Sequence, residues 1–249
     1  MISPAPRGKR TLYERLRLDR LNFWTFVVFA LLIFSTIFII FPFGKLFLQS
    51  FSTDEKAFTL DNYIRFFTKA YYRNALLNSL KICVMTTILA VAIGVPMAYV
   101  GTRFNLYAKK LINVMIVLSM LSPPFIGAYS WITLLGRNGL VTQLLGSIGI
   151  KFGSIYGFGG ILLVFTLKLF PMVYLYVSGA LAGIDASLEE ASENLGVAGF
   201  RRIMKITLPM ILPTILSSSL MVFMTALADF GTPRLIGEGY APLPVVIYK

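Results

Sequence analysis

Long stretches without a charged side chain dominate this sequence. Four of them carry no charge at all, and they cover residues 21–44, 82–102, 111–136 and 206–228. A fifth stretch, 152–184, is interrupted only by Lys168. A helix needs about 20 mostly apolar residues to cross a lipid bilayer. The sequence therefore predicts an all-α integral membrane protein with five spanning helices, near residues 23–44, 82–102, 111–135, 160–182 and 207–228.

The residue content argues against an enzyme. The chain has no histidine and one cysteine, Cys83, so it offers neither a Ser-His-Asp arrangement nor a typical zinc ligand set. It also lacks the Gly-rich sequence that cradles nucleotide phosphates. We therefore predict no catalytic residue, no metal site and no cofactor in this chain. If ATP drives the protein, a separate subunit must bind it.

Basic residues predict the orientation in the membrane. Six lysines and arginines lie within residues 1–22, beside only Glu14 and Asp19. Because short cytoplasmic flanks are enriched in Lys and Arg, this basic segment is predicted to be cytoplasmic. The formal net charge of +12 is spread around the apolar stretches, so it favours contact with anionic lipid over nucleic-acid binding. The same orientation places the loop of residues 185–209 in the cytoplasm.

That loop has an unusual internal pattern. The acidic residues of the loop lie in its first arm, residues 185–195, and the basic residues lie in its second arm, 197–207. Gly196 separates the two, and glycine is the usual residue just beyond a helix end. The pattern predicts two short helices that meet at a bend. Such a rigid projection between two spans is suited to contact with a partner protein.

The spacing of this loop resembles the EAA loop of permease subunits in binding-protein-dependent ABC importers. That family has Glu-Ala-Ala, three residues, Gly, nine residues, Ile, one residue and Leu-Pro. This chain has Glu190-Ala191-Ser192, Gly196, Ile206 and Leu208-Pro209 at the same intervals, with Ser192 as the single departure. The resemblance assigns the contact with an ATPase subunit to Glu190, Ala191, Ser192, Gly196, Arg201, Ile206, Leu208 and Pro209.

The resemblance further implies a type I importer permease, with residues 23–249 forming its transmembrane domain in a bacterial plasma (inner) membrane. It implies three protein partners: an ATP-binding cassette subunit, an external or periplasmic solute-binding protein and a second permease half. In that family a sixth helix normally follows, and some members carry two similar halves in one chain. We therefore expect the sequence to be truncated before its sixth helix.

Three other segments look like the ferric-iron branch of these permeases: 123–131, 134–139 and 228–233. The resemblance thus implies import of ferric iron. Polyamine, aminophosphonate and sulfate permeases share much of the pattern, so a polyamine, an aminophosphonate or another small anion stays open as the solute. An ion-driven secondary transporter is a more distant alternative, although the five predicted spans contain no Asp or Glu.

Four residues are candidates for a translocation path. Pro123 and Pro124 interrupt the third span, which predicts a kinked helix that either lines the path or serves packing alone. Lys168 is a charge inside the fourth span, and its long stem could carry the ammonium to the outer interface. Asp229 ends the fifth span, where it could line the path, cap a helix or pair with Arg234.

Overall fold

The computed structural model describes residues 23–52, 58–104, 107, 109–121, 123–150, 153–185, 187–188, 191–192, 197 and 199–248. Within these ranges the regular elements are helices, apart from one isolated bridge between Ser52 and Phe58. The chain divides into two compact units, Met1–Thr68 and Lys69–Lys249, and each is described by itself.

The first unit contains one long apolar helix. Helix α2 (Phe23–Ser35), the π-helical turn η1 (Thr36–Ile40) and helix α3 (Phe41–Ser50) form a continuous run of 28 residues. None of its residues is buried. The short helix α4 (Asp61–Thr68) follows, and the Tyr63 hydroxyl lies 2.8 Å from the Ser50 hydroxyl. This side-chain contact joins α4 to the end of α3.

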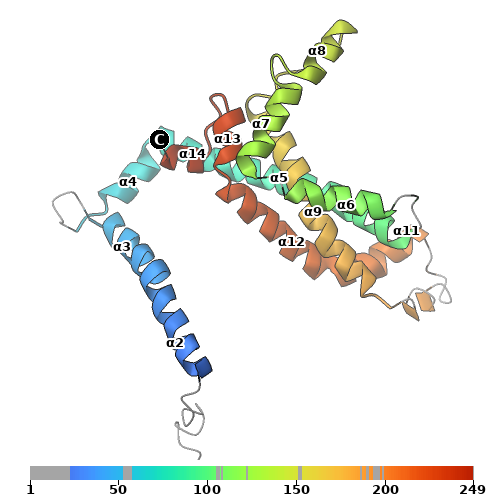
Figure 1. Cartoon of the computed structure of the whole chain (residues 1–249), viewed down its shortest axis with the longest axis horizontal. Coiled ribbons are helices and arrows are strands. Elements are labelled where there is room, and N and C mark those ends of the chain that lie inside the picture. Colours follow the sequence, from blue (N-terminus) through green and yellow to red (C-terminus); the bar gives the residue numbers. More distant parts are fainter. Residues whose placement is uncertain are drawn as a thin grey trace, which may run out of the picture. The chain divides into compact units, whose positions relative to one another are not determined.

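The second unit is a helical bundle built around three long helices. These are α5 (Ala70–Arg103), α9 (Phe158–Ala182) and α12 (Leu208–Ala228), which lie side by side in Figure 1. Helix α6 (Lys109–Met120) packs on α9, and α7 (Pro124–Leu135) leads into α8 (Leu140–Ser147). The remaining elements are α11 (Gly199–Arg202), the π-helical turn η2 (Ile203–Thr207), α13 (Gly231–Ile236) and α14 (Leu243–Ile247).

Four helices in the described residues are long and apolar enough to cross a membrane, by length and composition. They are Phe23–Ser50, Ala70–Arg103, Phe158–Ala182 and Gly199–Ala228. A fifth span is counted if the pair Lys109–Met120 and Phe125–Ser147 is taken as one crossing, with its two arms bent by 109°. The break falls where the two consecutive prolines leave a helix without its hydrogen-bond donors.

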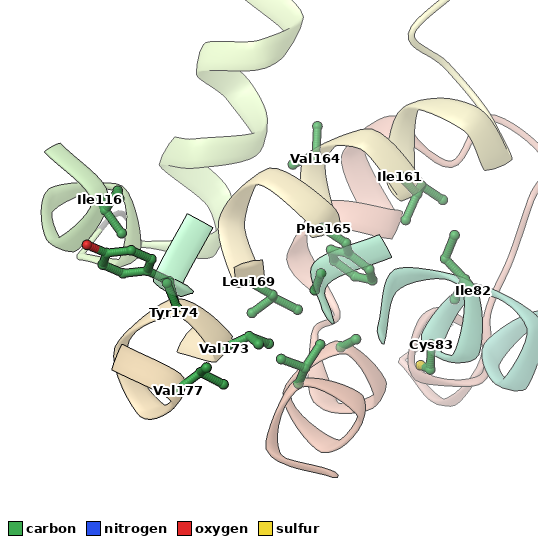
Figure 2. Close-up of a cluster of buried hydrophobic side chains, with 14 of the residues drawn as sticks. Ile82, Cys83, Ile116, Ile161, Val164, Phe165, Leu169, Val173, Tyr174 and Val177 are labelled. Carbon is green, nitrogen blue, oxygen red and sulfur yellow. The ribbon is translucent and has the colours of Figure 1, made fainter. Parts of the chain in front are cut away.

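The core of the bundle is centred on α9. Val164, Phe165, Val173 and Val177 are each at most 2% exposed, and Figure 2 shows them grouped with Ile82 and Cys83 of α5. Ile211, Ile215 and Val222 complete the cluster from α12. Helix α9 is apolar around most of its circumference, so it can be covered on several sides at once.

Small residues let α5 approach α9 closely. Ala90, Gly94 and Ala98 are buried and recur every four residues, so they share one face of α5. A Cβ atom added at Gly94 would lie 2.8 Å from the Cβ atom of Val173 and 3.0 Å from the carbonyl oxygen of Phe170. Close contact between helices through small residues is the usual packing mode in membranes, where lipid offers no hydrophobic drive for association.

Two helices begin well before the apolar stretches that predict them. Helix α5 starts at Ala70, although its charge-free stretch starts at Ile82, because residues such as Asn74 and Lys81 lie in the helix without ending it. The helix predicted near 207–228 begins at Gly199 and includes most of the expected second arm of the loop. An apolar stretch marks the membrane-crossing part of a helix, and the helix itself can be longer.

Candidate functional site

The charged residue inside the fourth span meets the charged residue that directly follows the fifth. The Nζ atom of Lys168, on α9, lies 2.7 Å from Oδ2 of Asp229, which directly follows α12. The side chains are 18% and 5% exposed, respectively. Lys168 therefore does not extend alone toward the interface, and the acidic partner is 61 residues away along the chain. Buried charges of opposite sign are stable together only where hydrogen bonds also satisfy them.

Asp229 also organises the turn between α12 and α13. The helix ends there because the backbone of Asp229 is extended, with φ −75° and ψ 112°. Its Oδ1 atom accepts a hydrogen bond from the backbone N–H of Thr232 at 2.9 Å, and Oδ2 lies 3.3 Å from the Thr232 hydroxyl. The carboxylate thus satisfies a donor in the first turn of α13, as capping residues do.

A hollow of about 590 Å³ lies beside this ion pair. Its lining comes from α7, α9, α12 and the start of α13, through Phe125, Lys168, Met221, Met224, Thr225, Ala228, Asp229, Phe230 and Gly231. A second hollow, of about 220 Å³, is lined by Lys168 together with residues such as Ser119, Ser130 and Trp131. Lys168 is therefore exposed to both.

The proline break brings α7 to the same place. Helix α7 starts at Pro124, and the carbonyl oxygen of Pro123 accepts a hydrogen bond from Gly127 at 2.9 Å. The next residue, Phe125, lines the larger hollow, and its ring centroid is 6.2 Å from that of Phe230. A Cβ atom at Gly231 would lie 3.3 Å from the Phe125 ring. The prolines thus position Phe125 beside Lys168 and Asp229 in the lining of the hollow, while the side chain of Pro124 lies outside the described part of the chain.

The coupling segment is described only in part. Glu190 and Gly196 lie outside the described residues, so the predicted bend at Gly196 also lies outside them. Ala191 and Ser192 are helical, and Ser192 is 3% exposed. The carbonyl oxygen of Ser192 accepts a hydrogen bond from the backbone N–H of Val197 at 2.9 Å.

Asp185 opens the same segment. The backbone N–H of Ser187 donates a hydrogen bond to Oδ1 of Asp185 at 2.9 Å. This bond, with a second from the Ser187 side chain, lowers the pKa of the exposed Asp185 carboxyl. The local turn therefore favours the ionised form at the start of the loop.

The second arm continues into the membrane without interruption. Helix α11, turn η2 and helix α12 form one run of 30 residues, Gly199–Ala228. Arg201 and Pro209 are exposed, whereas Ile206 and Leu208 are half-buried. Pro209 has no backbone N–H, and η2 ends two residues before it, as η1 ends two residues before Pro42 in the first unit. A π-helical turn accommodates the missing donor without ending the helix.

Sequence patterns did not indicate a polar contact that joins α9 to α6. The Tyr174 hydroxyl donates a hydrogen bond to Oδ1 of Asn113. Gly101 of α5 leaves room for that hydroxyl, since a Cβ there would lie 2.9 Å from it. Asn113 is the polar residue within an otherwise apolar part of α6, and that isolation was the available signal.

Several helices long and apolar enough to span a membrane, packed in one bundle, are typical of a polytopic membrane protein. The chain belongs to the family described as binding-protein-dependent transport system inner membrane component, which matches residues 90–248.

The names of relatives in this family specify different solutes. The chain is 29% identical over 213 residues to the ferric transport system permease protein FbpB of Actinobacillus pleuropneumoniae, covering 85% of this chain and 31% of that protein. It is 31% identical over 177 residues to the molybdenum transport system permease protein ModB of Haemophilus influenzae, covering 69% of this chain and 76% of that protein. The chain spans about a third of the length of the ferric permeases that it matches.

A solved structure has the same fold. It is a chain in the crystal structure of a bacterial alginate ABC transporter in complex with an alginate pentasaccharide-bound periplasmic protein. The TM-score is 0.76 at 19% sequence identity, and the match covers 95% of this chain and 85% of that chain. The bundle therefore has the type I ABC-importer permease fold.

Proposed function

We propose that this chain is a transmembrane permease subunit of an ATP-driven importer. Its partners are an ATP-binding cassette subunit, an external solute-binding protein and a second permease half. ATP is bound by the separate subunit. The N-terminal segment and the loop of residues 185–209 face the cytoplasm of a bacterial inner membrane, in keeping with the basic residues that flank the spans.

One observation carries this proposal: a single continuous helix leads from the coupling segment to the buried ion pair. The run Gly199–Ala228 starts next to the exposed Arg201 and ends one residue before Asp229. At 1.5 Å per residue its 30 residues extend over roughly 45 Å. A push on the cytoplasmic end of such a rod reaches the hollow as a rigid-body movement.

This arrangement supports alternating access. The ATPase subunits close when they bind ATP, and the EAA-type segment, Glu190–Pro209, transfers that movement to the spans. The coupling requires that the segment contact the ATPase differently in its two states. Glu190 and Ala191 would supply the contact, Gly196 the bend, and Leu208 and Pro209 the attachment to α12. The hollow beside Lys168 and Asp229 would form part of the path.

Ferric iron is the solute that we propose first. The name of the Actinobacillus relative and three sequence segments favour it. The molybdenum permeases among the relatives favour a small oxyanion as the second candidate. The solute-binding protein would set much of the final selectivity, because it delivers the solute to the outer face.

The test uses the intact importer, with its ATPase and binding protein, in proteoliposomes. Gly196→Leu and Glu190→Lys should each reduce ATP-dependent uptake to background, since the first straightens or strains the bend and the second reverses the charge at the contact. The amount of permease inserted in the membrane should not change. Asp61→Lys, a charge reversal at an exposed position outside the segment, is the matched control and should transport normally.

Normal uptake by the Gly196 or Glu190 variant would contradict the coupling role. Uptake that depends on an ion gradient and does not require ATP would instead identify a secondary transporter. Copurification of an ATPase with the unmodified permease, lost in the Glu190→Lys variant, would test the contact directly. Parallel uptake of radiolabelled iron, molybdate and spermidine would compare the candidate solutes.

A further inference from the structure

The two members of the buried ion pair differ in how fully their polar atoms are engaged. Both oxygens of Asp229 already accept hydrogen bonds: Oδ1 from the backbone of Thr232, and Oδ2 from Lys168 and the Thr232 hydroxyl. The side chain is 5% exposed. The carboxylate is thus held by the protein itself and has little capacity left for a solute.

Lys168 is less completely satisfied. An ammonium group has three N–H donors, and Asp229 accepts one of them. The side chain is 18% exposed and lines both hollows, which places the other donors where a solute could reach them. Of the described residues that line the larger hollow, Lys168 and Asp229 are the ionisable ones.

The hydroxyl groups near Lys168 do not offer free donors to a solute. The Thr225 hydroxyl donates to the carbonyl oxygen of Met221 at 2.7 Å, and the Ser130 hydroxyl donates to that of Ile126 at 2.9 Å. Both protons are therefore used within their own helices. The remaining lining is largely apolar, through Phe125, Met221, Met224 and Phe230. Lys168 remains as the charged donor in a low-dielectric setting, where charge-assisted hydrogen bonds are strong.

The size of the hollow also fits a small solute. Its volume of about 590 Å³ lies within the usual range for small-molecule sites, which runs from about 300 to 1,000 Å³. We propose that Lys168 binds an anionic group of the translocated solute in this hollow. The solute would be either an oxyanion or a metal ion carried in a chelate of net negative charge. This inference rests on the proposed importer function and specifies the form in which the solute passes.

A free metal cation or a polyamine does not fit this site. The ammonium would repel it, and the Asp229 carboxylate already accepts hydrogen bonds on both of its oxygens. Asp229 would act as a positioning residue, which holds the ammonium between the two hollows through the turn at Thr232.

The first experiment measures the charge preference of the hollow without requiring a known solute. In the intact importer, Cys83→Ser is combined with Met224→Cys, which places a thiol in the lining of the larger hollow. The thiol is labelled with two methanethiosulfonate reagents, one with a sulfonate group and one with a trimethylammonium group. Met210→Cys, at another exposed position of the same helix, is the control.

We expect the sulfonate reagent to be favoured at least threefold at position 224 relative to position 210. This preference should disappear when Lys168→Gln and Asp229→Asn are introduced together. The double change removes both charges while a neutral hydrogen-bonded pair can remain, so the turn at Thr232 is preserved. An equal preference at the two positions, or an unchanged preference after the double substitution, would overturn the proposal.

The second experiment distinguishes the two kinds of anion by ATP-dependent uptake into proteoliposomes. Molybdate represents an oxyanion, ferric citrate an anionic chelate and spermidine a cation. Uptake of the transported anion should fall at least tenfold in the Lys168→Gln/Asp229→Asn variant and persist in Lys168→Arg. Transport of spermidine by the unmodified importer, or full uptake by the neutral variant, would refute the role of Lys168.

Failure of the two proposals can be separated. If the unmodified importer shows no ATP-dependent uptake, the proposed function fails, while the labelling ratio still decides the charge preference of the hollow. If uptake is ATP-dependent but insensitive to the double substitution, the importer function stands and only the anion site is lost.

Discussion

Two apolar helices of similar length differ completely in their surroundings within their own units. The helix Phe23–Ser50 has no buried residue, whereas α9 buries eleven of its residues in the second unit. Both are apolar enough to cross a membrane. Hydropathy therefore identifies a span but does not say whether its side chains meet lipid or protein. Small residues and isolated polar groups carry that second kind of information.

The largest expected effect comes from adding bulk where α5 and α9 approach each other. Gly94→Leu should destabilise the second unit by about 3 kcal/mol, since the new side chain collides with Val173 and with the carbonyl of Phe170. Gly44→Leu, in α3, is the matched control because nothing lies within 4 Å of its added Cβ. Thermal unfolding of the permease in detergent would measure both. A similar loss for the two variants would remove the distinction between the helices.

A cavity in α9 should have a smaller effect. Phe165→Ala leaves a void at a position that is 0% exposed, with an expected cost of roughly 2 kcal/mol. The cost is lower than in a soluble core because lipid is as apolar as the protein interior, so mainly packing contacts are lost. Phe29→Ala, at a position that is 52% exposed, should change the unfolding temperature little. Equal shifts would mean that the N-terminal helix also packs against protein.

The smallest effect concerns the hydrogen bond between α9 and α6. Tyr174→Phe removes the donor to Asn113 and should cost about 1 kcal/mol or less, as hydrogen bonds between membrane helices usually do. Tyr176→Phe, on the exposed side of the same helix, is the control. Hydrogen–deuterium exchange of α6 would report the change, with faster exchange expected only in the Tyr174 variant. An unchanged exchange rate in α6 would show that the hydrogen bond does not stabilise this helix.

Local chemistry explains what could be predicted from the sequence. Charge-free runs identify the spans because no charge can be placed cheaply in lipid, and Pro123 and Pro124 predict a break because proline removes backbone donors. The start of α5 could not be found in this way, because Lys81 stays within the helix and lies 4.9 Å from the centre of the Phe158 ring. A residue that can rest against an aromatic ring gives no sign of a helix boundary.

The ion pair between Lys168 and Asp229 could not be predicted from the sequence, for a different reason. Arg234 lies five residues from Asp229 and was the natural candidate, whereas Lys168 lies on another helix. Which of the two is the partner depends on the rotation of α9 about its axis and on the turn at Thr232. Both are fixed by packing around Phe165 and Val173, which a single sequence does not reveal.

The π-helical turn at Ile203–Thr207 has a geometric consequence for the continuous helix Gly199–Ala228, in which it lies. Each residue of an α-helix turns the chain by about 100° around the helix axis and adds a rise of about 1.5 Å along it. One residue more or less in this turn would rotate the face that carries Arg201 by about a quarter of a revolution relative to Asp229, with hardly any change in length. This turn of five residues thus determines how the side chains at one end of the helix are rotated about its axis relative to those at the other end.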